Sequence, residues 1–238
     1  MPAADLEVQA LSAGYGRTTV LEDVSFAVPA GKRLSILGRN GMGKTTLLAT
    51  LMGLTRHRGG GIRIGGRDVT ALGTQARAQA GLGLVPQTRE IFKGLSVEEN
   101  LFVGLKDRPR SAIEEAYALF PRLAERRRNL GSQLSGGEQQ MLATARTILG
   151  RPAILMLDEP LEGLAPVICD MLMEAFTQLA ASGAMTILFV EQRLESALAF
   201  AEDVIILERG RIVWSGTTAG LRAQGDVLER YLGVGGLH

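Results

Sequence analysis

One short segment, Gly38 to Thr45, constrains the fold of this chain more than any other part of its sequence. It fits the pattern G-x-x-x-x-G-K-[ST], with a short apolar run, 34–37, before it and an apolar helical pattern after it. A glycine-rich turn between a strand and a helix points backbone N–H groups inward, and the helix start adds positive potential. The segment therefore predicts a phosphate-binding loop within an α/β fold.

The residue types in this loop predict which parts of a nucleotide it holds. Lys44 is expected to reach the β- and γ-phosphates, and the Thr45 hydroxyl is expected to bind Mg²⁺. The alternative is a glycine-rich turn without a ligand, which the complete motif in its expected context disfavours. The residues predicted to surround the phosphates are Gly38, Arg39, Asn40, Gly41, Met42, Gly43, Lys44, Thr45 and Thr46.

A second motif stands where the apolar strand 154–157 ends in two carboxylates, Asp158 and Glu159. Asp158 is predicted to hold Mg²⁺ through water, and Glu159 to orient or deprotonate an attacking water molecule. The alternative is a strand that ends at a solvated, charged turn. The phosphate-binding loop upstream favours the catalytic interpretation.

Composition bounds the remaining choices. The 238 residues are 46% hydrophobic and 21% charged, which argues against disorder. A net charge of +1 disfavours nucleic acid as a partner. Cys169 is the single cysteine, so no internal disulfide is possible and a reducing compartment is expected. Neither a signal-peptide pattern nor an apolar run of spanning length occurs, so any membrane pore must come from another polypeptide.

Hydrophobic patterns predict how the chain is organised. Alternating positions at Leu6, Val8 and Ala10, and again over 24–28, indicate a small antiparallel sheet near the N-terminus. The apolar runs 153–157 and 186–190 flank a helical pattern and indicate parallel strands buried on both faces. A hairpin is expected over 204–214.

The segment 88–150 is predicted to be mostly helical. Ser96 with Glu99, and Ser135 with Glu138, each fit the S-x-x-E pattern of a helix start. We therefore predict one domain over residues 1–238, with a core of about 1–87 and 151–238 and a helical subdomain of about 88–150.

The segment 134–140, Leu-Ser-Gly-Gly-Glu-Gln-Gln, does more than begin a helix, because its paired glycines expose N–H groups that can bind an anion. Here the chain resembles the ATP-binding cassette (ABC) family, whose signature is Leu-Ser-Gly-Gly-Gln. The resemblance implies that Ser135, Gly136, Gly137 and Glu138 contact the ATP held by a partner subunit. It also implies a P-loop NTPase (RecA-like) α/β core with an N-terminal antiparallel β subdomain and an inserted α-helical subdomain, and ATP with Mg²⁺ as cofactors.

The same resemblance assigns four single residues. Tyr15 matches the aromatic that stacks on adenine, and Gln87 matches the glutamine that contacts Mg²⁺ and the attacking water. As isolated residues, each is explained as well by a surface tyrosine or a polar loop side chain. Gln192 stands where the family has a catalytic histidine, and Ala165 where it has an aspartate. A glutamine amide can donate a hydrogen bond to the γ-phosphate but cannot carry a proton as imidazolium does.

Three segments, 89–101, 162–166 and 190–192, resemble one subgroup, the second ATPase subunit of importers for branched-chain amino acids and of the similar urea importers. That resemblance implies a sister ATPase subunit (or a homodimer), two transmembrane permease subunits, and indirectly a periplasmic substrate-binding protein. It places the chain peripherally on the cytoplasmic face of the inner membrane. The alternatives are a urea or amide importer ATPase, a soluble cassette ATPase without a transport role, and a regulatory module that does not turn over.

Two surface features complete the predictions. Residues near 88–105 are expected to dock on the membrane subunits, with Ile91 and Phe92 exposed after Gln87; the alternative is that both side chains fold back into the helical lobe. The arginines Arg122 and 126–128 are expected to form a solvated helix face; the alternative is contact with lipid headgroups or the sister subunit.

Overall fold

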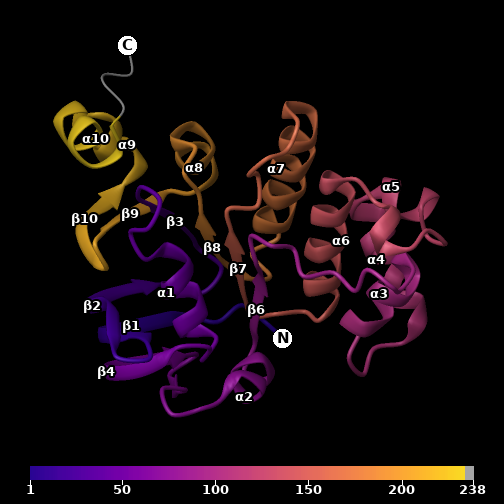
Figure 1. The fold of residues 1–238 in the computed structure, drawn as a ribbon, viewed down its shortest axis with the longest axis horizontal. Coiled ribbons are helices and arrows are strands. Elements are labelled where there is room, and N and C mark those ends of the chain that lie inside the picture. Colours follow the sequence, from indigo (N-terminus) through magenta and orange to yellow (C-terminus); the bar gives the residue numbers. More distant parts are fainter. Residues whose placement is uncertain (234–238) are drawn as a thin grey trace.

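The computed structural model describes residues 1–233, which form two sheets with helices around them (Figure 1). The four-stranded sheet has the order β2-β1-β4-β5 and is antiparallel throughout. Its strands are β1 (Leu6–Tyr15), β2 (Thr18–Val28), β4 (Arg56–Ile64) and β5 (Arg67–Asp68). The predicted antiparallel β subdomain is thus confirmed.

The alternation expected in β1 is interrupted by an irregularity. Leu6, Val8, Leu11 and Ala13 are buried, but Ala10 is exposed and has a left-handed backbone with φ of 47°. The pairing with β2 shifts register between Val8 and Leu11. A bulge of this kind inserts an extra residue, so later side chains change faces. The expectation that Ala10 continues the buried face was therefore wrong.

The six-stranded sheet has the order β10-β9-β3-β8-β7-β6, in which only the edge strand β10 runs antiparallel to its neighbour. Its strands are β3 (Arg33–Leu37), β6 (Leu82–Val85), β7 (Ile154–Asp158), β8 (Thr186–Val190), β9 (Asp203–Glu208) and β10 (Arg211–Thr217). The predicted hairpin is the β9–β10 pair.

Residues of β7 divide alternately between two apolar cores. Ile154 and Met156 pack toward α1 (Lys44–Leu51), while Leu155 and Leu157 pack toward the other face of the sheet. All four are fully buried, which explains a continuous apolar run instead of an alternating one. Helices α7 (Pro166–Ala181) and α8 (Leu194–Phe200) cover that second face.

Helix α1 lies between the two sheets and is held at its C-terminal end by a buried arginine. Arg77 of α2 (Thr74–Gln79) donates hydrogen bonds to the carbonyls of Thr50, at 2.7 Å, and Leu51, at 2.9 Å. A cation at the negative end of a helix satisfies free carbonyls and the dipole. This contact holds α1, the helix after the phosphate loop, against α2, which lies between β5 and β6 in the chain.

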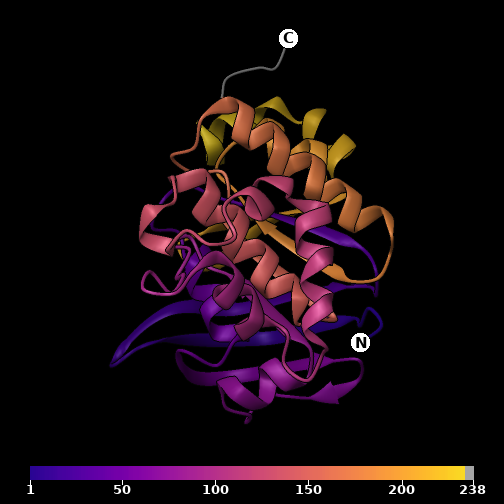
Figure 2. The ribbon, with the colours of Figure 1, turned by 90° about the vertical axis from the view of Figure 1, so that its right-hand side faces the viewer.

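The chain between β6 and β7 is helical. Its elements are α3 (Val97–Gly104), η1 (Arg110–Ile113), α4 (Glu114–Leu119), α5 (Pro121–Glu125), η2 (Gly131–Gln133) and α6 (Gly136–Leu149). They stand apart from the antiparallel sheet in Figure 1 and lie toward the viewer in Figure 2. Both predicted capping boxes are present, at Ser96 with Glu99 and at Ser135 with Glu138. The predicted fold class is therefore confirmed.

The chain continues after β10 through α9 (Thr218–Arg222) and α10 (Gly225–Leu232), beside β9 and β10 (Figure 1). Among the residues described, no helix combines the length and the apolar character that a membrane crossing requires.

Candidate nucleotide-binding site

The topology of the six-stranded sheet brings the predicted catalytic residues to one edge. The phosphate loop follows β3, Gln87 follows β6, Glu159 follows β7 and Gln192 follows β8. Because these strands are parallel, their carboxyl ends lie at the same edge. Ligands of open α/β sheets bind at that edge.

The phosphate loop depends on glycine for its backbone path. Gly38 has φ of 153°, and a Cβ atom there would lie 2.4 Å from the carbonyl oxygen of Leu207. Gly43 has φ of 104° immediately before α1. Side chains other than hydrogen are strained in such conformations. The loop therefore passes close to β9 and leads directly into the start of α1, the arrangement of a phosphate cradle.

Lys44 closes the loop over itself. Its Nζ donates hydrogen bonds to the carbonyls of Gly38, at 2.8 Å, and Arg39, at 3.1 Å. The same atom lies 3.2 Å from Oε1 of Glu159, and the two side chains are only 3% and 6% exposed. Because water does not reach these buried side chains, each charge is neutralised by the other in the ion pair. The lysine amino group is thus held at the point where loop and strand β7 meet.

The carboxylate of Glu159 accepts hydrogen bonds from both predicted glutamines. Gln192 donates a short hydrogen bond to Oε2 of Glu159, and Nε2 of Gln87 lies 3.4 Å from the same oxygen. Gln87 also donates to Glu162. The backbone of Glu159 is left-handed, with φ of 46°, which is uncommon outside glycine and concentrates at functional sites. All three residues predicted to be catalytic therefore meet around one carboxylate.

Thr45 and Asp158 form the second polar pair of the site. The Thr45 hydroxyl donates to Oδ1 of Asp158 at 3.2 Å. Burial raises the pKa of Asp158 to about 6, although the hydrogen bond from Thr45 opposes the shift. A hydroxyl and a buried carboxylate are oxygen donors, and Mg²⁺ is held in proteins by one or two carboxylates together with substrate phosphates. The residues present therefore fit a magnesium ion.

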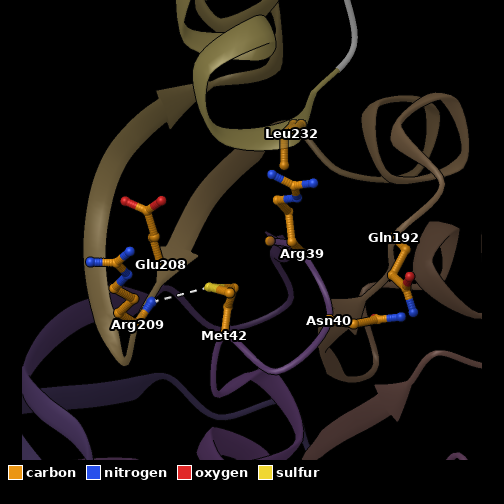
Figure 3. A pocket seen from close by; sticks show the side chains of 8 residues that line it. Arg39, Asn40, Met42, Gln192, Glu208, Arg209 and Leu232 are labelled. Carbon is orange, nitrogen blue, oxygen red and sulfur yellow. Dashed lines mark hydrogen bonds between the residues drawn. The ribbon is translucent and has the colours of Figure 1, made fainter.

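Two cavities border the loop. One of about 270 Å³ is lined by Val20, Asn40, Gly41, Gly43, Lys44, Thr45, Thr46, Gln87 and Glu159. The other, of about 650 Å³, is lined by Gly38, Arg39, Asn40, Met42, Gln192, Glu208, Arg209 and Leu232. Figure 3 shows Asn40 directed toward Gln192, and Leu232 of α10 placed over Arg39. The smaller cavity thus holds Gln87 and Glu159, and the larger one extends toward α10 and holds Gln192.

Tyr15 and the signature residues lie outside these cavities. Tyr15 ends β1 and is 48% exposed, so its contact with adenine stays a prediction. Ser135 to Glu138 stand at the start of α6 and line neither cavity. A Cβ atom on Gly136 would lie 3.3 Å from Nη1 of Arg89. The signature segment therefore lies outside the cavities that border the chain's own phosphate loop, and its role toward a partner stays a prediction.

Glu138, the signature carboxylate, is held from two sides. Its backbone N–H donates to Ser135 Oγ at 3.3 Å, and its carboxylate accepts from the Ser135 N–H at 2.9 Å. Arg122 and Arg126 also donate to it through Nε, at 3.1 and 3.3 Å. Burial acts to raise the pKa of Glu138, but these hydrogen bonds and charges hold it below its ordinary value. The expected solvation is found, since the side chains of Arg122 and Arg126 are 45% and 41% exposed, but both are also paired with Glu138, and Arg126 lies just after α5.

One organising residue was missed in the sequence. Glu191 is 2% exposed and accepts hydrogen bonds from the backbone N–H groups of Leu161, Gln192 and Arg193, at 3.0 to 3.2 Å. Burial raises its pKa. It joins the segment that follows β7 to the segment that follows β8, close to Glu159. The signal was present, because Glu191 ends an apolar strand just as Asp158 does.

Comparison with known proteins agrees with this geometry. A protein-family model described as ABC transporter matches residues 21–162. The high-affinity branched-chain amino acid transport ATP-binding protein BraG of Pseudomonas aeruginosa is 39% identical, over 96% of this chain and 99% of BraG. The lipopolysaccharide export system ATP-binding protein LptB of Haemophilus influenzae is 33% identical, over 96% of this chain and 97% of LptB.

A solved ATP-binding subunit of an ABC transporter matches with a TM-score of 0.81 and 29% identity, over 96% of each chain. The chain belongs to the ABC transporter family, and its fold and site are those of an ATP-hydrolysing subunit. The resemblance inferred from Gly38–Thr45 and from 134–140 is thereby confirmed.

Proposed function

We propose that this chain is the ATPase subunit of an importer for branched-chain amino acids, bound peripherally at the cytoplasmic face of the inner membrane. Its likeness to BraG over nearly the full length of both proteins carries this proposal. The likeness to LptB is lower and extends over a similar share of the chain, which makes an export system the competing direction of transport.

In the proposed mechanism, ATP competes with Glu159 for Lys44. The phosphates of ATP would draw the lysine amino group away from the carboxylate that lies 3.2 Å from it. Glu159 then becomes free to accept a proton from water or to orient it, still held by the amides of Gln192 and Gln87. Thr45 and Asp158 would hold Mg²⁺, which neutralises charge on the β- and γ-phosphates when bound.

Gln192 has a narrower role than the histidine it replaces. Its amide already donates to Glu159, so it fixes the orientation of the carboxylate. With ATP present the same donor can turn to the γ-phosphate. Because an amide does not titrate, this residue adds no proton step to turnover.

The proposed partners are a sister ATPase (or a second copy) and two permease subunits. Toward the ATPase partner, the chain presents Ser135 to Glu138. Toward the membrane, it presents an apolar groove of about 300 Å³ between the core and the helical lobe. Phe92 and Val103 line the groove and are 47% and 53% exposed. Exposed apolar surface of this kind favours docking.

The structure divides the predicted pair Ile91 and Phe92. Ile91 packs against the core of the helical lobe, so the expectation that it is exposed was wrong. Phe92 stays exposed, with the Arg146 guanidinium 4.9 Å from its ring. The docking proposal therefore rests on Phe92 and Val103 without Ile91.

The test of the transported class is reconstitution with the permease subunits and the binding protein encoded in the same operon. ATP hydrolysis in vesicles should rise when the binding protein carries leucine. Stimulation by urea would transfer the assignment to a urea importer, and stimulation by lipopolysaccharide to an exporter. Hydrolysis by the chain alone, indifferent to any permease, would favour a soluble cassette ATPase. A complex that binds ATP and never hydrolyses it would favour a regulatory module.

The test of the docking surface is Phe92→Ala, with Val167→Ala as the matched control, because Val167 is 64% exposed on α7 outside the groove. Phe92→Ala should reduce co-purification with the permease subunits and leave ATP binding by the isolated chain unchanged. Normal assembly and transport would contradict the docking role. Lost ATP binding would show that Phe92 serves folding instead.

A further inference from the structure

The signature segment of this chain carries a carboxylate where the family signature has a neutral amide. Glu138 keeps the helix-capping role of that position, because its carboxylate accepts the Ser135 N–H. Glutamine satisfies the same N–H in a capping box. The cap alone therefore does not require a negative charge here. A negative charge at the start of α6 does weaken the attraction of that helix end for phosphate oxygens.

Two guanidinium groups offset this charge. Arg122 and Arg126 both donate through Nε to Oε1 of Glu138, and Arg122 also pairs with Glu125. The arginine side chains are 45% and 41% exposed, whereas that of Glu138 is 10% exposed. Ion pairs with such exposed partners contribute little to folding stability. The main effect of these two ion pairs is therefore to balance the charge of Glu138 at the start of α6.

We propose that Arg122 and Arg126 are positioning residues for the composite ATP site: they neutralise Glu138 so that the signature segment can approach the triphosphate held by the partner subunit. This inference rests on the proposed function, in which Ser135 to Glu138 face the partner's ATP. A third guanidinium group lies near the same helix start. Arg89 Nη1 lies 3.3 Å from the position of a Cβ on Gly136.

The neutralisation makes a prediction that depends on the residue at position 138. In the wild-type background, Arg122→Ala with Arg126→Ala leaves a bare carboxylate at the helix start and should raise the KM for ATP about threefold or more. In the background of Glu138→Gln, the same two changes expose no charge and should leave the KM nearly unchanged. Arg128→Ala is the control, because Arg128 is exposed, belongs to the same arginine run and takes part in none of these ion pairs.

The measurement is steady-state hydrolysis against ATP concentration in the complete complex, with thermal unfolding of each variant. Charge-keeping changes, Arg122→Lys with Arg126→Lys, should retain most of the wild-type KM. An equal rise of KM in both backgrounds would overturn the proposal and assign the arginines a structural role. An unchanged KM in the wild-type background would overturn it as well.

A separate variant distinguishes failure of the composite-site proposal from failure of the charge-balance proposal. Ser135→Asp keeps an N-cap side chain but adds a carboxylate, so it should raise the KM whatever the arginines do. If Ser135→Asp has no effect, the signature segment does not meet the partner's ATP, and the proposed function fails at that point. If Ser135→Asp raises the KM and Glu138→Gln does not rescue the arginine changes, only the charge-balance proposal fails. Binding of ATP by the isolated chain should stay unchanged in every arginine variant.

Discussion

The phosphate loop and the signature segment are both glycine-rich helix starts, yet the fold treats them in opposite ways. At the loop, Lys44 and Glu159 satisfy each other, and Gln87 and Gln192 point at the same carboxylate. At the signature, Glu138 is paired with Arg122 and Arg126, and the helix start lines neither cavity beside the loop.

This difference supports the proposal that the phosphate loop and the signature segment supply different halves of an ATP site. The loop side contains its own cation, carboxylates and amides, so it forms a closed network until a ligand enters. On the signature side, the charge of Glu138 is paired within the chain, and Ser135 at the start of α6 is exposed. A phosphate loop that is complete within one chain, together with a signature segment that lies outside that chain's own cavities, fits an ATP site shared between two chains.

The largest expected effect comes from breaking each half separately. Lys44→Ala should abolish ATP binding, since it removes the cation that lies against the loop. Ser135→Asp should leave ATP binding by the isolated chain unchanged and raise the KM of the complex so far that hydrolysis is negligible at the ATP concentration that saturates the wild type. Each variant alone should be inactive in the complex. A mixture should recover hydrolysis where two copies pair, because one composite site then has an intact loop and an intact signature. No recovery in a mixture that forms dimers would contradict the division.

Glu159→Gln should bind ATP and slow hydrolysis by about 10²–10⁴, the usual worth of a general base or water-positioning group. It should also release Lys44 from its ion pair, so ATP affinity should not fall. Single-turnover hydrolysis and equilibrium ATP binding check both halves of this expectation. Turnover close to wild type would remove Glu159 from the mechanism. Glu162→Gln, at the neighbouring exposed carboxylate, is the control.

Gln192→Ala should slow hydrolysis less than the Glu159 change does. Loss of one transition-state hydrogen-bond donor costs roughly 10²–10³ at most. Gln192→His should retain activity, because imidazole can also donate to Glu159 or to phosphate. Comparing kcat for the three proteins tests this order. A correctly folded but inactive histidine variant would show that the site is built around the amide.

The smallest expected effect is on stability. The pKa of Asp158 is raised to about 6 in the fold, above its ordinary value, so the ionised carboxylate destabilises the ligand-free protein above that pH. Asp158→Asn should therefore raise the free energy of unfolding at about pH 8 by roughly 1–3 kcal/mol. The gain should shrink as the pH falls through about 6 and vanish near about 4, where the wild-type carboxyl is protonated.

Urea denaturation of Asp158→Asn and wild type at about pH 8 and about pH 4 measures this difference in the free energy of unfolding. Asp170→Asn, at an exposed aspartate of α7, should show no comparable pH-dependent gain. Equal stability of Asp158→Asn and wild type at about pH 8 would show that the buried carboxylate is not strained in the absence of its ligand.

Contiguous motifs determined much of this protein by themselves. The loop 38–45 and the capping boxes at Ser96 and Ser135 each have their hydrogen-bond partners within a few residues. Local backbone geometry therefore decides their contacts. The two buried apolar runs likewise predicted the parallel strands, because their burial on both faces requires helices on each side.

Contacts between distant segments were decided only by the tertiary structure. Gln87 and Gln192 reach Glu159 because the strand order places β6, β7 and β8 side by side. Arg122 and Arg126 reach Glu138 because α5 packs against α6. Ile91 turns inward while Phe92 turns outward, although the two are neighbours in an apolar pair. In each case the sequence supplies the chemical group, but its partner depends on which faces of separate elements meet, and no short-range pattern encodes that.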